Sequence, residues 1–105
     1  VLPVAERLLA APALQRFFDP AFYRRAWNEL ELTRGDGGLQ RLDRLVELDS
    51  GFWVLDYKSS GSDSGRLDAY RAQVAAYCSV VAAVFPERPV HGALIFADGS
   101  VVEVG

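Results

Sequence analysis

Apolar and polar residues follow two different periods along the chain, and each period predicts a different kind of element. From residue 4 to residue 18 the apolar residues recur at helical spacing, in two short pieces separated near Pro12. The face that these residues share consists of Leu8, Leu9, Leu14, Phe17 and Phe18. Pro20 predicts the start of another short helical turn that runs to Arg25. Residues 1–26 are therefore predicted to be a helical lead-in.

The period then changes to the alternation that is typical of β-strands. Residues 27–34 place Leu30 and Leu32 on one side and polar residues on the other. A glycine-rich turn at 35–38 leads to a return strand at 39–48, and a second turn at 49–51 leads to a short, largely apolar strand at 52–58. The pattern predicts a three-stranded meander whose last strand is buried centrally in a sheet.

The second half of the chain predicts one long helix and two further strands. A polar, serine- and glycine-rich loop at 59–66 precedes a helix at roughly 67–85, which Pro86 ends. The buried stripe of this helix is predicted to be Tyr70, Val74, Tyr77, Val81 and Val84. Strands at 90–97 and 100–104 flank a turn at Asp98-Gly99. The fold class is therefore α/β (mixed), with about five strands in a mixed sheet and the long helix packed on it.

Length and composition narrow the class of protein. The chain has 105 residues, which fits a single domain, and 50% of them are hydrophobic, which is enough to bury a core. No apolar run is long enough to span a membrane. Cys78 is the only cysteine, so we expect neither an internal disulfide nor a zinc site, and we interpret it as small core filler in a cytoplasmic protein. Because the first residue is valine, we expect the chain to be a piece of a longer protein.

The only lysine occupies a conspicuous position. Ten arginines supply the other positive charges, while Lys58 follows Asp56 by two residues at the end of the apolar strand. Alternation places Asp56 and Lys58 on one face and Tyr57 on the other. Asp43 lies on the preceding strand, where antiparallel pairing can bring it alongside Asp56.

Two carboxylates and a backbone carbonyl suit Mg²⁺, which prefers oxygen ligands. A nearby lysine can orient a water molecule and stabilise charge on a phosphate, as phosphodiester hydrolysis requires. For a bare Asp-x-Lys sequence, a simple salt bridge at a strand end is the better interpretation. The second aspartate on the partner strand and the loop and helix that come after the lysine favour a site instead.

These motifs together resemble a known superfamily. The segment LQRLDRLVELDSGFWVLDYKSS resembles the core of the PD-(D/E)XK nucleases, and most of all the carboxy-terminal nuclease domain of RecB/AddA-type, UvrD-like helicase–nucleases (exonuclease V beta subunit-like). The matching pieces are Leu42-Asp43-Arg44-Leu45 and Val54-Leu55-Asp56-Tyr57-Lys58-Ser59. The helical Q-x-x-x-Y motif of that family matches Gln73 and Tyr77, and the ending LIFADGSVVEV is similar to its closing hairpin. The resemblance spans about residues 27–105.

The resemblance implies a role for each matching residue. Asp43, Asp56 and the Tyr57 carbonyl would bind Mg²⁺ or Mn²⁺, and Lys58 would be the catalytic lysine. Gln73 would organise the site, with a solvated polar residue as the alternative. Tyr77 would contact DNA, although a core role is at least as plausible.

The Asn28-Glu29 pair and the lack of a histidine at the expected place also bear on the resemblance. Asn28-Glu29 fits the acid that opens the first strand of the family, but we interpret Glu29 as a solvent-facing strand acid. The family has a metal-binding histidine on an earlier helix, whereas the only histidine here, His91, falls on a late strand and is expected to be structural. We expect the true ligand to lie upstream of this chain, which would then bind metal weakly and cleave poorly.

The leading hypothesis is therefore a metal-dependent DNA (exo)nuclease domain, fused to upstream ATP-dependent helicase domains, in a bacterial cytoplasmic complex with a partner subunit that acts in double-strand-break repair and recombination. No phosphate-binding G-x-x-x-x-G-K-(S/T) loop occurs in the chain, so any ATP hydrolysis must take place elsewhere. The alternatives are a non-catalytic module that binds DNA or braces a subunit, and a stand-alone Mg²⁺ nuclease. The net charge of −3 argues mildly against a module that binds DNA by charge alone.

Overall fold

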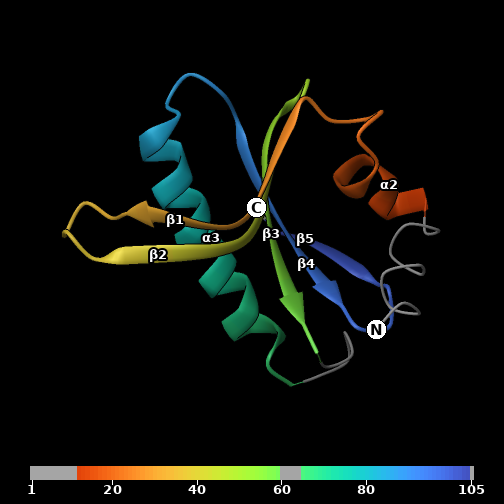
Figure 1. Cartoon of the computed structure of the whole chain (residues 1–105). Helices are drawn as coiled ribbons and strands as arrows, with labels where there is room; N and C mark the ends of the chain where they lie inside the picture. The colour runs from red at the N-terminus through yellow and green to blue at the C-terminus, as the bar shows by residue number, and fades with distance from the viewer. Residues whose placement is uncertain (1–11, 60–64, 105) are drawn as a thin grey trace.

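The computed structural model describes residues 12–59 and 65–104. Along the chain it contains α2 (Pro12–Phe18), β1 (Arg25–Thr33), β2 (Leu39–Leu48), β3 (Gly51–Lys58), α3 (Leu67–Val84), β4 (Val90–Phe96) and β5 (Val101–Val104). The mixed α/β class, the five strands and the long helix predicted from the sequence are confirmed (Figure 1). The helix predicted at residues 4–11 lies outside the described residues.

The sheet has the strand order β1-β2-β3-β4-β5. Strands β1, β2 and β3 form the predicted antiparallel meander. Helix α3 then crosses over the sheet, so β4 pairs parallel to β3, and β5 pairs antiparallel to β4. The parallel pair makes β3 the centre of the sheet, in agreement with the prediction from its apolar sequence.

The helical turn predicted from Pro20 to Arg25 is wrong. The Asp19 side chain accepts a hydrogen bond from the Ala21 N–H at 2.9 Å, and the Asp19 carbonyl accepts one from the Phe22 N–H at 2.9 Å, which closes a turn. The Arg24 N–H then donates to the Glu47 carbonyl at 2.8 Å. Pairing with β2 therefore extends the chain where the proline pattern alone favoured a helix.

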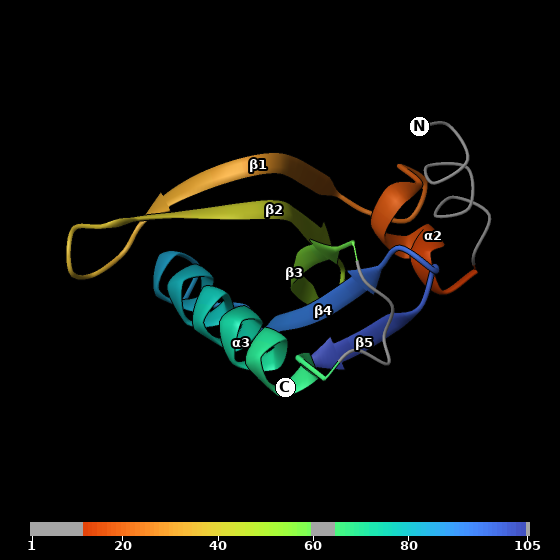
Figure 2. The ribbon, with the colours of Figure 1, turned by 90° about the horizontal axis from the view of Figure 1, so that it is seen from below.

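The two helices cover opposite faces of the sheet (Figure 2). On the face of α2, a core cluster contains Leu14, Phe17, Val46, Leu48, Trp53, Leu55, Ala93 and Ile95. On the face of α3, Val74 and Val81 are fully buried against residues such as Val54 and Leu94. Asp56 and Lys58 also lie on the α3 face, so packing of this helix positions the candidate site.

The predicted buried stripe of α3 is confirmed in part: Val74 and Val81 are buried, Tyr70 and Tyr77 are half-buried, and Val84 is exposed. Val84 keeps 45% of its surface exposed, and the next residue, Phe85, instead stacks on Phe52 with ring centroids 4.3 Å apart. The stripe ends early because α3 itself ends at Val84, and the chain turns toward the sheet there. Among the described residues, no helix is both long enough and apolar enough to cross a membrane.

Gly92 on β4 determines how closely α3 approaches the sheet. A Cβ atom on this residue would lie 2.4 Å from Val74 Cγ1 and 2.9 Å from Cys78 Sγ. The half-buried Cys78 is therefore packed at the interface between helix and sheet, as expected of core filler, and burial raises the pKa of its thiol to about 11. A side chain at position 92 would push the helix outward.

Strand β1 contains one unusual backbone conformation, at Glu29. Its φ of 52° lies in the left-handed region, and it is the one non-glycine residue with positive φ in the described part of the chain. The register pairs Asn28 with Arg44 and Leu30 with Leu42, so Glu29 stands opposite Asp43. Trp27 and Leu30 pack on the same core cluster although they lie three positions apart, an odd spacing that regular alternation would place on opposite faces. The left-handed conformation of Glu29 shifts the alternation of side chains along β1 by one residue. As a result, the apolar side chains on both sides of Glu29 face α3.

The first prediction concerns Glu29. Glu29→Gly should be more stable than Glu29→Ala by about 1 kcal/mol, because an L-residue is strained in the left-handed region. The order should reverse at the ordinary strand position Glu31, where glycine costs about 0.5–1 kcal/mol relative to alanine. Chemical denaturation of the four variants measures the free energy of unfolding for each. If alanine were more stable than glycine at both positions, backbone strain at Glu29 would be contradicted.

The second prediction concerns Gly92. Gly92→Ala should destabilise the fold by about 1–3 kcal/mol, because overpacking forces side chains or backbone to move. Removing the closest neighbour in Gly92→Ala/Val74→Ala should recover part of the loss expected from the two single changes. Thermal or chemical unfolding measures the stability of each variant. If the loss in the double variant equalled the sum of the losses in the two single variants, a clash between the two positions would be contradicted.

Candidate active site

The candidate catalytic residues meet where β2 and β3 separate. The register of this strand pair ends with Arg44 opposite Leu55. Asp43 and Asp56 are the next residues on the two strands, so antiparallel geometry brings them side by side one step beyond the last pair. The Asp43 carboxylate interacts with that of Asp56, in agreement with the antiparallel approach predicted from the sequence.

Lys58 connects the sheet to helix α3. Its ammonium lies 2.8 Å from Asp56 Oδ2 and donates a hydrogen bond to Gln73 Oε1 at 2.8 Å. It also lies 4.4 Å from the centre of the Tyr70 ring. Asp56 and Lys58 therefore share the α3 face, as the alternation predicts, and both are largely buried there.

Asp43 contacts the main chain of β3 between those two residues. Its Oδ2 accepts a hydrogen bond from the Tyr57 N–H at 2.8 Å. The N–H and C=O groups of one strand residue point toward the same neighbouring strand. The Tyr57 carbonyl therefore faces the side on which Asp43 lies.

Gln73 and Tyr77 complete the group from helix α3. They lie four residues apart, which places them on neighbouring turns of one helical face. Desolvation raises the pKa of Tyr77, the negative charges of Asp56 and Asp43 raise it further, and a hydrogen bond with Gln73 lowers it. The five side chains of Asp43, Asp56, Lys58, Gln73 and Tyr77 thus interact within one group.

Tyr70 also lines this group, although the sequence suggested only a core role for it. It precedes Gln73 by three residues and Tyr77 by seven, and that spacing on one helical face could have indicated its place. Its ring provides a surface against which the Lys58 ammonium rests. Such a contact helps to hold the cation in one position.

Asp56 is the electrostatic centre of the group. Its pKa is raised from 3.8 to about 6, chiefly by desolvation; the Lys58 ammonium opposes the shift and the neighbouring Asp43 carboxylate reinforces it. Asp56 Oδ2 is fully buried, and the Lys58 ammonium lies 2.8 Å from it without the angular geometry of a regular hydrogen bond. A single ammonium thus compensates this buried oxygen, while a second carboxylate adjoins it.

A small divalent cation fits this arrangement. It would relieve the repulsion between the two carboxylates and coordinate the buried oxygen of Asp56. Within residues 12–59 and 65–104, no three acidic, histidine or cysteine side chains come together to hold a metal. The protein would therefore supply Asp43, Asp56 and the Tyr57 carbonyl, and water would complete the coordination, as Mg²⁺ commonly allows.

Glu29 and His91 both lie outside this group. The Glu29 side chain is 72% exposed and forms an ion pair with Arg41 at 2.6 Å, which matches its interpretation as a solvent-facing acid. His91 stacks on Trp53, with ring centroids 4.8 Å apart, on the opposite face of the sheet. The upstream histidine that the resemblance implies stays a prediction.

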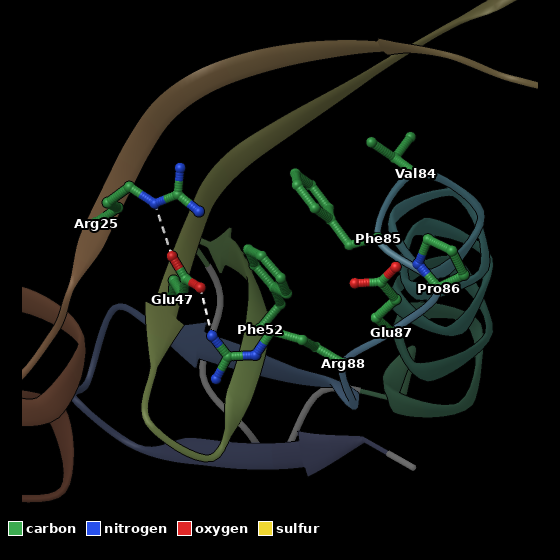
Figure 3. A pocket seen from close by; sticks show the side chains of 8 residues that line it. All are labelled: Arg25, Glu47, Phe52, Val84, Phe85, Pro86, Glu87 and Arg88. Atoms are coloured by element: carbon green, nitrogen blue, oxygen red, sulfur yellow. Dashed lines mark hydrogen bonds and ion pairs between the residues drawn. The ribbon is translucent and has the colours of Figure 1, made fainter.

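A pocket of about 270 Å³ opens at the other end of α3 (Figure 3). Its floor includes the stacked Phe52 and Phe85. Beside them, buried Glu47 accepts a hydrogen bond from Arg25 at 2.7 Å and a second one from Arg88. These bonds lower the pKa of Glu47, the Arg25 bond most of all, although burial opposes the shift. Because both arginines already neutralise this carboxylate, the pocket lacks the reactive pairing found around Asp56.

Comparison with known proteins does not assign this chain to a family. No protein-family model matches this chain, and no curated protein matches it. The resemblance to PD-(D/E)XK nucleases therefore rests on the motifs and remains a prediction.

The third prediction concerns the raised pKa of Asp56. Because its folded pKa lies above 3.8, ionisation costs stability as pH rises from about 4 to about 6, and the full cost persists at higher pH. Asp56→Asn should therefore unfold at a higher temperature than the parent at pH 8, by roughly 1–2 kcal/mol in free energy. At pH 4 the two should be nearly equal. Thermal unfolding in EDTA at both values measures the effect, and a less stable variant at pH 8 would contradict it.

Proposed function

We propose that this chain is the nuclease domain of a Mg²⁺- or Mn²⁺-dependent DNA (exo)nuclease with a restriction-endonuclease-like core. The observation that supports the proposal most is the meeting of Asp43, Asp56, Lys58 and Gln73 at the point where β2 and β3 separate. A salt bridge alone needs neither the second carboxylate nor the glutamine. Hydrolysis of a phosphodiester uses each of them.

The bound cation would supply Lewis-acid stabilisation of charge on the phosphate. Asp43 and Asp56 would hold that cation, and the Tyr57 N–H fixes the orientation of the Asp43 carboxylate. The raised pKa of Asp56 makes it partly protonated near pH 6, so cation binding competes with a proton there. Affinity for Mg²⁺ should therefore fall as pH drops below this range.

Lys58 orients the attacking water and stabilises negative charge on the phosphate oxygens. The Gln73 side chain holds its ammonium at 2.8 Å, and the Tyr70 ring limits its movement on another side. Tyr77 hydrogen-bonds with Gln73 and so braces the residue that positions Lys58. Tyr77 is half-buried, which favours this bracing role over direct contact with DNA.

The wider setting is proposed from the resemblance. The substrate would be DNA strands delivered by helicase domains upstream in the full-length protein, within a bacterial complex that includes a partner subunit. Repair of double-strand breaks and recombination would be the process served. The full-length protein would also provide the histidine that this chain lacks at the expected place.

The fourth prediction tests catalysis. Lys58→Met and Asp56→Asn should each reduce Mg²⁺-dependent cleavage of linear DNA by about 10²-fold or more, because each removes charge stabilisation that acts in the transition state. The assay uses the full-length protein, where ATP-driven unwinding serves as an internal control that neither change should affect.

A matched control is Glu103→Gln, which removes one charge from a 65% exposed side chain on β5 and should cleave at the parental rate. Cleavage at the parental rate in Lys58→Met would refute the catalytic role. Normal DNA binding without any cleavage in the parent protein would favour the non-catalytic module. Titration of Mg²⁺ against Asp43→Asn separates loss of the cation from loss of chemistry.

A further inference from the structure

Arg44 is a buried cation without a carboxylate partner in the described part of the chain. It is 7% exposed and lies on the α2 face of the sheet, opposite the candidate active site. Its Nε donates to the Phe17 carbonyl at 3.0 Å, and its Nη1 donates to Asn28 Oδ1 at 2.7 Å. Both acceptors are neutral. Buried arginines are rare unless they are paired, and this one forms no ion pair within the described residues.

One nitrogen of this guanidinium, Nη2, donates to no acceptor within residues 12–59 and 65–104. An anion that approaches this face could accept a hydrogen bond from Nη2. The planar guanidinium can donate two parallel hydrogen bonds to one phosphate, which makes arginine a good phosphate ligand.

Aromatic rings surround the same guanidinium. Arg44 lies 5.0 Å from the centre of the Phe18 ring and 5.5 Å from that of Tyr23. Phe18 in turn stacks with Tyr57 at 6.2 Å and 27° between the ring planes. Tyr57 is 41% exposed, one of the few large apolar residues within residues 12–59 and 65–104 that remain so open. We call Arg44, Phe18, Tyr23 and Tyr57 the aromatic–arginine surface.

Tyr57 joins this surface to the candidate active site. Its backbone N–H donates to Asp43, and its neighbours Asp56 and Lys58 lie on the other face.

We propose that the aromatic–arginine surface binds a nucleotide of single-stranded DNA, with the base stacked on Tyr57 and the phosphate held by Arg44. A planar exposed ring beside a cation that forms no ion pair within the described residues matches the two halves of a nucleotide, and stacking of this kind accepts any base. Duplex DNA does not fit, because its bases are already stacked inside the helix. The choice of DNA rests on the proposed function, whereas the binding itself needs no metal.

The test measures binding in EDTA, so that it does not depend on cleavage. A labelled thymidine oligonucleotide of about 12 residues is titrated with the whole chain by fluorescence anisotropy. Tyr57→Ala should weaken binding about tenfold, whereas Tyr57→Phe should stay within about twofold of the parent, because every aromatic face can stack. Leu39→Ala is the control, because Leu39 is 66% exposed at the far end of the β1–β2 hairpin.

Arg44→Lys is a second, independent variant that keeps the charge and loses the planar fork. It should weaken binding to the single strand and leave duplex binding unchanged. If Arg44→Lys does not fold, the tyrosine pair still decides the outcome. Equal affinity of Tyr57→Ala and the parent, or an equal loss in Leu39→Ala, would overturn the proposal.

The two proposals fail in different ways. Weakened binding by Tyr57→Ala in a protein that neither binds Mg²⁺ nor cleaves DNA would retain the surface and refute the nuclease. Magnesium-dependent cleavage that Lys58→Met abolishes, together with unchanged single-strand binding by Tyr57→Ala, would retain the nuclease and refute the surface.

Discussion

The charge of Asp56 is the constraint around which one end of the sheet is organised. The carboxylate is 6% exposed, and the Lys58 ammonium lies 2.8 Å from one of its oxygens. An ionised group in that position is costly without a compensating charge. Lys58 supplies part of the compensation, while Asp43 increases the cost. The sheet thus maintains a carboxylate pair whose repulsion an additional cation would relieve, and this is the physical argument behind the proposed metal site.

Helix α3 makes this arrangement possible because it lies so close to the sheet. The absence of a side chain at Gly92 allows Val74 and Cys78 to approach β4, and Gln73 is the neighbour of Val74 on the helix. The same approach brings Gln73 and Tyr70 to the Lys58 ammonium. Packing of the core and positioning of the lysine are therefore one feature of the fold.

The backbone of β1 departs from regular strand geometry beside the candidate active site. Glu29 adopts its left-handed conformation opposite Asp43, so the alternation of β1 resets next to the point where β2 and β3 separate. Backbone strain of this kind persists where surrounding structure holds it in place. Arg44 provides such support from the other face, since it joins Asn28 on β1 to the end of α2. The two faces of the sheet are linked through these neighbouring residues.

Much of this protein was determined by local sequence alone. Alternation placed Asp56 and Lys58 on one face, and the meander between Leu39 and Lys58 brought Asp43 to them, because strand pairing over short turns depends directly on pattern. Helical spacing likewise placed Gln73 and Tyr77 together. Local pattern failed at Pro20, where pairing of Arg24 with Glu47 overrode a helical preference, and at Val84, where the chain turned away. The left-handed Glu29, the contact of Lys58 with Tyr70 and the unpaired charge of Arg44 were decided only by tertiary structure, because each depends on residues far apart in sequence that meet through packing.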